Sequence, residues 1–101
     1  MTKARGKLKT YPWDPVTHIK TEKDVAAYLE AAFEDGDPSI IAEVLGDIAR
    51  SKGMAKIAKK TGLGRESLYK ALSREGNPEL LTVLKVVHAL GLRLTVTADA
   101  A

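Results

Sequence analysis

The stretch IAKKTGLGRESLYKALS, residues 57–73, constrains the fold of this chain more than any other. Apolar residues keep helical spacing in its first part, stop at the Gly-Leu-Gly of residues 62–64, and resume at Leu68. Glycine reaches positive φ at low cost, so this turn allows the chain to reverse tightly. The pattern predicts two short helices, at residues 54–61 and 65–74, joined by a three-residue turn.

Two short helices joined in this way have the spacing of a helix-turn-helix motif. The helices of such a motif cross closely near the turn, so the first needs a small residue that faces the second. Ala58 is small, and Gly62 follows it by four residues, as the motif requires. The corner between the helices is predicted to be filled by three apolar residues: Ile57, Leu63 and Leu68. We therefore predict a helix-turn-helix at about residues 54–74.

The second predicted helix has two different faces. With about 100° of rotation per residue, its apolar side chains fall together on one side: Leu68, Ala71 and Leu72. The opposite side carries long hydrogen-bonding side chains, which can read base edges in the major groove of DNA. We predict that this face binds DNA through Arg65, Glu66, Ser67, Tyr69, Lys70 and Ser73.

Cationic side chains surround this face. Five of them could neutralise DNA phosphates: Lys52, Lys56, Lys59, Lys60 and Arg74. Three of these are predicted to belong to the DNA-binding site: Lys56, Lys60 and Arg74. An ordinary solvated helix surface is the competing interpretation of the same residues. Two positions are ambiguous: Gly64 is a weaker N-cap than Ser or Thr, and Glu66 could accept from cytosine, pair with Lys70, or only favour the helix terminus.

The formal net charge of +3 conceals two blocks of opposite sign. Residues 21–49 carry −7 and residues 50–74 carry +7, whereas residues 1–20 carry +4 and residues 75–101 carry −1. Uneven charge of this kind bears on binding partners and not on fold. The basic block coincides with the predicted helix-turn-helix, which favours a nucleic-acid partner over two merely solvated faces.

Length and composition limit the classes of protein that remain. The 101 residues suffice for one domain with a modest core. Cysteine is absent, so no disulfide framework or thiolate metal site can form. No apolar run approaches the roughly 20 residues that span a bilayer, and no apolar segment follows the basic N-terminus as in a signal peptide. We expect a cytoplasmic protein with no membrane partner.

Capping residues predict two helices before the helix-turn-helix. Thr21 begins the first, with Asp24 in the place of the usual Glu or Gln of a capping box. That helix should run to about residue 34, with five apolar residues inward: Val25, Ala26, Leu29, Ala32 and Phe33. Asp37 caps the second helix, whose first position is Pro38. A wide apolar stripe makes it a core helix: Ile40, Ile41, Val44, Leu45, Ile48 and Ala49.

A last helix is predicted at residues 79–90, with Asn77 as its N-cap and Pro78 at its first position. It is so rich in apolar residues that we expect burial on most sides. After Gly91, the sequence LRLTVTA alternates apolar and polar residues with the period of a strand, at about residues 92–98. The fold class is therefore predicted to be all-α, with five helices and a short C-terminal β-strand.

A lone exposed strand has unpaired backbone N–H and C=O groups and promotes aggregation unless another strand pairs with it. The edge of this strand could pair with a second copy while its apolar residues cover the helical core: Leu92, Leu94 and Val96. Antiparallel pairing of that kind would form a homodimer and could place two recognition helices about 34 Å apart, one turn of DNA. Pairing within the chain against residues 11–19 is the alternative.

The chain is predicted to contain one domain and one tail. Residues 1–10 are polar, basic and without periodicity, so they are expected to form a flexible tail. Residues 11–101 are predicted to form a single DNA-binding domain, in which Tyr11 and Trp13 pack on the first helix.

An enzyme finds little support in this sequence. His18 and His88 are the only histidines, and His88 is expected to be a packed or capping residue and not a base or a ligand. No phosphate loop, metal-ligand spacing or nucleophile elbow occurs. We predict no catalytic residue, no metal site and no cofactor. An RNA-binding role would require stacking aromatic residues on the basic face, where Tyr69 is the only one.

Three segments are more specific than a generic helix-turn-helix: DIARSKGM, GMAKIAKKTGLGRESLYKALS and GNPELLTVLKVVHALGL. Within about residues 13–97, the chain resembles the probable addiction module antidote family, relatives of HigA-type antitoxins in the lambda-repressor-like helix-turn-helix class. The resemblance implies a five-helix lambda-repressor-like DNA-binding domain. On the family pattern, the base-reading positions correspond to Arg65, Glu66, Tyr69 and Lys70.

The resemblance also implies a function. The expected protein is a sequence-specific DNA-binding antitoxin of a type II toxin–antitoxin module, which neutralises a RelE/ParE-like toxin and represses its own operon as a dimer. The alternative is a stand-alone XRE-type transcriptional regulator without a toxin partner, and a small basic open reading frame next to the gene would separate the two.

The acidic block suggests where a toxin could bind. RNA-cleaving toxins must approach phosphate-rich RNA and are usually basic, so an acidic surface would attract them electrostatically. We hypothesise a toxin-facing surface that includes Glu22, Asp24, Glu30, Glu34 and Asp35. A solvated acidic face that keeps DNA away from the wrong side of the protein is the competing interpretation.

Overall fold

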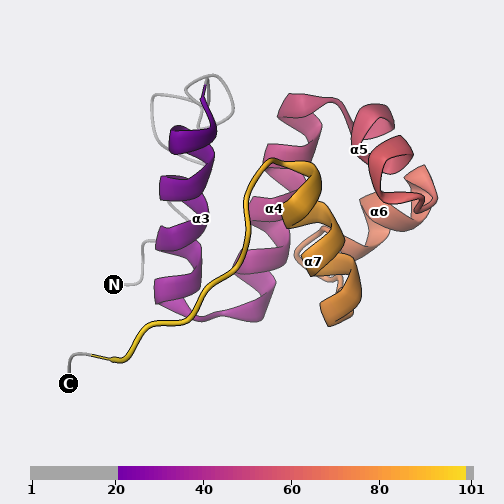
Figure 1. The fold of residues 1–101 in the computed structure, drawn as a ribbon. Coiled ribbons are helices and arrows are strands. Elements are labelled where there is room, and N and C mark those ends of the chain that lie inside the picture. Colours follow the sequence, from indigo (N-terminus) through magenta and orange to yellow (C-terminus); the bar gives the residue numbers. More distant parts are fainter. Residues whose placement is uncertain (1–20, 100–101) are drawn as a thin grey trace, which may run out of the picture.

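The computed structural model describes residues 21–99, which form five α-helices and no strand. In chain order, and with the labels of Figure 1, these are α3 (Glu22–Asp35), α4 (Pro38–Lys52), α5 (Met54–Thr61), α6 (Arg65–Ala71) and α7 (Leu80–Ala89). The prediction of an all-α fold with five helices is confirmed. The predicted tail and the positions of Tyr11, Trp13 and His18 lie outside the described residues.

Side-chain caps fix the first two helices where the sequence placed them. The Asp24 backbone N–H donates to the Thr21 hydroxyl oxygen over 3.1 Å, and the Asp24 carboxylate accepts from the Thr21 N–H over 3.0 Å. This reciprocal pair is the predicted capping box of α3. Asp37 is the N-cap of α4, and its carboxylate accepts from the Ser39 N–H over 2.9 Å. Pro38 follows the cap as the first residue of the helix.

Helix α4 lies between α3 on one side and the group of α5, α6 and α7 on the other (Figure 1). It contacts α3, α5 and α6, and α5 also contacts α7. Its apolar stripe is therefore buried on two sides. The core cluster around it draws on all five helices: Val25, Leu29, Ala32, Ile40, Val44, Leu45, Ile48, Ala49, Met54, Ile57, Leu68, Leu72, Val86, Val87 and Leu90.

Gly46 allows α4 and the end of α6 to touch. A Cβ atom added at this glycine would lie 2.1 Å from the Leu72 carbonyl oxygen, far inside van der Waals contact. The backbones of the two segments therefore meet without an intervening side chain. The end of α6 is held directly against the central helix of the fold.

Helices α6 and α7 both differ from their predicted bounds. The predicted helix at 65–74 ends at Ala71, because Leu72 leaves helical geometry with ψ of 53°. Helix α7 begins at Leu80 with Glu79 as its N-cap, so the prediction of Asn77 as cap is wrong. An N-cap side chain reaches only the N–H groups two or three residues ahead, and Glu79 is still extended there.

Several apolar residues that were predicted to be inward are exposed. On α3 the buried residues Val25, Leu29 and Ala32 form a narrow stripe, and Ala26 and Phe33 lie outside it. On α7 the expected burial on most sides is wrong for the first turn, where Leu80 and Leu81 are 69% and 59% exposed. Burial on α7 is concentrated toward its C-terminal half, where Val86 and Val87 join the core cluster.

The predicted C-terminal strand is not formed in the single chain. Residues 92–99 run as a non-helical segment past α4 toward the lower left of Figure 1, without a strand ladder among the described residues. Leu92 packs against the core, and its N–H donates to the Val87 carbonyl over 3.1 Å. Leu94 is 38% exposed and Val96 is 96% exposed. A strand requires a partner backbone, and no described segment supplies one; pairing with a second copy stays a prediction.

None of the described helices combines the length and the hydrophobicity that crossing a membrane requires.

Candidate nucleic-acid interface

The turn between α5 and α6 is fixed by two residues. Gly62 has φ of 74° and ψ of 13°, and its N–H donates to the Ala58 carbonyl over 2.9 Å. The Thr61 hydroxyl donates to the Ile57 carbonyl over 2.9 Å and accepts from the Leu63 N–H over 3.2 Å. The left-handed glycine was predicted. The role of Thr61 was not, although a threonine directly before a turn glycine is a residue type that bonds backbone groups locally.

Helix α6 is held by its apolar side. Leu68 and Leu72 are 1% and 0% exposed, and both pack in the core cluster together with Ile57 of α5. Ala71 is half-buried. Gly64 caps the helix without a side-chain hydrogen bond, as its residue type implies. The position of this seven-residue helix therefore depends on packing against α4 and α5 more than on its own capping.

The opposite side of α6 faces outward. Five of the predicted base-reading residues are exposed there: Arg65, Glu66, Ser67, Tyr69 and Lys70. The sixth, Ser73, lies beyond the helix end and is half-buried, with its hydroxyl donating to the Lys70 carbonyl over 2.9 Å. One face of α6 thus combines two cations, one carboxylate, one hydroxyl and one aromatic ring on a rigidly held helix.

The three predicted phosphate contacts are not equivalent. Lys56 and Lys60 are both exposed on α5. Arg74 is also exposed, but its Nε lies 3.3 Å from the Glu43 carboxylate of α4. This ion pair ties the segment after α6 to the central helix. A guanidinium has five N–H donors, so the contact with Glu43 is compatible with the predicted phosphate contact.

A buried carboxylate near α6 was missed by sequence reasoning. Asp47 is only 4% exposed, and its Oδ1 accepts from the Arg50 guanidinium over 2.5 Å. A Cβ at Gly46 would lie 3.3 Å from Arg50 Nη1 and close to the Leu72 carbonyl, so the guanidinium lies beside the end of α6. The signal was available: Asp47 interrupts the apolar stripe of α4 and has an arginine three residues later.

Fold and site together define a small all-helical protein in which two short helices are braced around a glycine turn. Comparison with known sequences gives the family. The model of the family described as "Probable addiction module antidote protein" matches residues 9–98. An uncharacterized protein of Haemophilus influenzae is 42% identical over 84 residues, which cover 83% of this chain and 87% of that protein. No solved structure matches the chain significantly.

The chain belongs to the probable addiction module antidote family. Membership supports a role in a toxin–antitoxin module and implies a toxin as partner. It also favours a regulatory protein over an enzyme.

Proposed function

We propose that this protein is a HigA-type, lambda-repressor-like antitoxin that binds operator DNA through α6, neutralises a RelE/ParE-like toxin and represses its own operon. The observation that carries the DNA-binding part is the division of α6. Leu68 and Leu72 are fully buried on one side, while Arg65, Tyr69 and Lys70 are exposed on the other. A braced helix with an outward polar face is what major-groove recognition requires.

The chemistry of this face suits duplex DNA. The major groove is about 12 Å wide and admits one α-helix. Arg65 and Lys70 could each bond the O6 and N7 of guanine, whereas Glu66 could accept from cytosine N4. Lys56 and Lys60 on the neighbouring helix would contact phosphates, which position the protein but do not read sequence. Residues 50–74 carry a charge of +7, which adds long-range attraction to DNA.

The toxin-binding part of the proposal rests on the family and on the acidic helix α3. Five carboxylates of the hypothesised toxin-facing surface are solvent-exposed: Glu22, Asp24, Glu30, Glu34 and Asp35. Phe33, which is 39% exposed, adds an apolar group beside Glu30 and Glu34. Exposed carboxylates on the same helix as an exposed aromatic ring suit a basic protein partner.

A homodimer completes the proposal. Leu94 and Val96 are exposed on a non-helical segment whose sequence alternates like a strand. We propose that this segment, residues 92–98, pairs with the same segment of a second copy. Such pairing could place two copies of α6 about one turn of DNA apart, the spacing that dimeric helix-turn-helix proteins need.

Co-expression with the genomic neighbour tests the proposal. The tagged protein should co-purify with a small basic protein encoded next to its gene, and that protein should inhibit growth when it is produced alone. The pair, or the antitoxin alone, should shift DNA from the region upstream of the operon. DNA binding without any toxin neighbour would favour the stand-alone XRE-type regulator, and failure to shift upstream DNA would exclude both forms of the proposal.

A further inference from the structure

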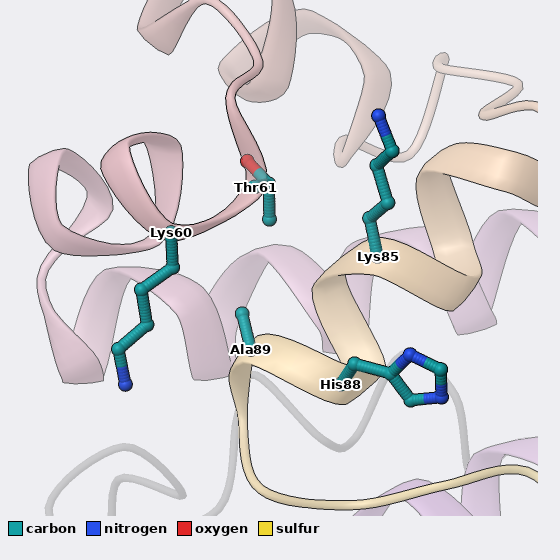
Figure 2. A pocket seen from close by; sticks show the side chains of 5 residues that line it. All are labelled: Lys60, Thr61, Lys85, His88 and Ala89. Atoms are coloured by element: carbon teal, nitrogen blue, oxygen red, sulfur yellow. The ribbon is translucent and has the colours of Figure 1, made fainter.

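A depression of about 420 Å³ lies between the C-terminal part of α5 and α7 (Figure 2). It is lined by Lys60, Thr61, Lys85, His88 and Ala89. In Figure 2, Ala89 and Thr61 lie in the middle of the lining, and Lys60 of α5 and Lys85 and His88 of α7 lie at its margin with their side-chain ends directed away from one another. No acidic residue belongs to this lining, so its charge is positive or neutral throughout.

The two lysines of the depression are not engaged elsewhere in the described part of the chain. The ion pairs there join Arg50 to Asp47 and Arg74 to Glu43, and neither Lys60 nor Lys85 takes part in them. A lysine ammonium is a point charge on a flexible four-carbon stem, so both ammonium groups can turn toward an anion that enters the depression. The arrangement therefore suits an anionic ligand.

Helix dipoles account for only part of this arrangement. Lys60 and His88 lie in the last turns of α5 and α7, where a cation is favourable beside the helix C-terminus. Lys85 lies before the last turn of α7 and gains little from that effect. Its half-buried side chain nevertheless lines the depression opposite α5. Lys85 is therefore the residue that distinguishes a ligand site from ordinary helix capping.

We propose that this depression binds a phosphate group of the DNA backbone, so that α7 extends the interface built on α5 and α6. The inference rests on the proposed DNA-binding function. Lys60 belongs both to the predicted phosphate contacts and to the depression, so the two surfaces are continuous. A phosphate of the DNA backbone is the favoured anion because Lys60 continues the basic segment, residues 50–74, that also contains the proposed recognition helix.

A salt titration of DNA binding tests the inference with Lys85→Ala, and Lys85→Arg serves as the charge-preserving variant. Lys23→Ala on α3 is the matched control, since Lys23 is exposed and belongs to another helix. Affinity is measured for upstream DNA and for unrelated DNA of the same length. We expect Lys85→Ala to weaken both equally, by roughly threefold to tenfold at low salt, and to reduce the salt slope by about one. Lys85→Arg and Lys23→Ala should keep the wild-type slope.

A second variant keeps the inference testable if Lys85→Ala does not fold. His88 is exposed, so His88→Glu should fold while it places a carboxylate at the rim of the depression. We expect about tenfold weaker DNA binding, whereas Ala26→Glu at an exposed position of α3 should have no such effect. Thermal melting of each variant separates a loss of folded protein from a loss of contact.

The outcomes are distinguishable. If Lys85→Ala behaves like Lys23→Ala while the wild-type protein binds DNA, the inference is wrong and the proposed function stands. If the wild-type protein binds neither DNA, the proposed function fails and the inference fails with it. A titration with inorganic phosphate is the third arm. Amide resonances of residues 85–89 that move with inorganic phosphate but not with DNA would indicate a site for small phosphates and overturn the assignment to the backbone.

Discussion

The guanidinium carbon of Arg65 lies 6.0 Å from the centre of the Tyr69 ring, one turn further along α6. Both side chains are exposed on the face that we propose to read DNA. A cation near the face of an aromatic ring is attracted by the ring quadrupole, by about 0.5–1 kcal/mol at an exposed site. Tyr69 therefore restricts the positions that the Arg65 guanidinium samples before DNA arrives.

Tyr69→Ala should weaken operator binding by about twofold to fivefold, because the ring no longer orients Arg65. Tyr69→Phe should bind nearly as well as the wild type, since the phenyl ring keeps the same quadrupole. A mobility-shift titration on upstream DNA measures both. If Tyr69→Phe loses as much affinity as Tyr69→Ala, the hydroxyl contacts DNA directly and the orienting role is wrong.

Arg65→Ala and Lys56→Ala should have different effects on the specificity and the salt dependence of DNA binding. Loss of a bidentate base contact costs about 1–3 kcal/mol and relaxes specificity at one base position. Loss of a phosphate contact weakens binding evenly across sequences and lowers the salt slope by about one. We expect the first pattern for Arg65→Ala and the second for Lys56→Ala, measured on operator variants at several salt concentrations. Intact operator binding by Arg65→Ala would place the recognition face elsewhere.

Two glycine substitutions should separate backbone strain from steric conflict. Gly62→Ala meets no atom within 4 Å but keeps φ of 74°, so it should lose about 1 kcal/mol of unfolding free energy. Gly46→Ala should lose about 3 kcal/mol, because its Cβ would overlap the Leu72 carbonyl oxygen. Intrinsic helix propensity predicts the opposite sign for Gly46→Ala. Urea denaturation followed by circular dichroism measures both, and a more stable Gly46→Ala would refute the close contact.

Charge reversal on α3 tests the proposed toxin surface. Glu30→Lys/Glu34→Lys should reduce toxin capture in a pull-down by about tenfold, because a basic partner is then repelled. Glu75→Lys/Glu79→Lys makes the same change in charge at exposed positions away from α3 and should capture toxin normally. Equal capture by the two double variants would mean that the acidic face serves only solvation or the exclusion of DNA.

Much of the local structure could be predicted from residue types. The Thr21–Asp24 capping box, the cap at Asp37 and the left-handed Gly62 all occur as expected. Each depends on interactions within a few residues, so the sequence contains the relevant information. The division of α6 into buried leucines and exposed polar residues follows from helical periodicity for the same reason.

Tertiary contacts decided the features that the sequence did not show. Phe33 and Leu80 are apolar residues on helices, yet both are exposed, because none of the helices within residues 21–99 covers their positions. The contact of Arg74 with Glu43 joins two segments that are far apart in the sequence, so no local pattern predicted it, and a phosphate contact of Arg74 stays a prediction. The residues of the α5–α7 depression come from separate helices, so no local pattern could group them.

The sequence by itself therefore determined where helices begin, turn and divide into apolar and polar faces, because capping, glycine conformation and periodicity are short-range properties. Only the tertiary structure decided which apolar faces are covered, which charges are paired and which cations surround one depression. Those outcomes depend on segments that are distant in the chain and meet only in the folded protein, where α4 contacts α3, α5 and α6.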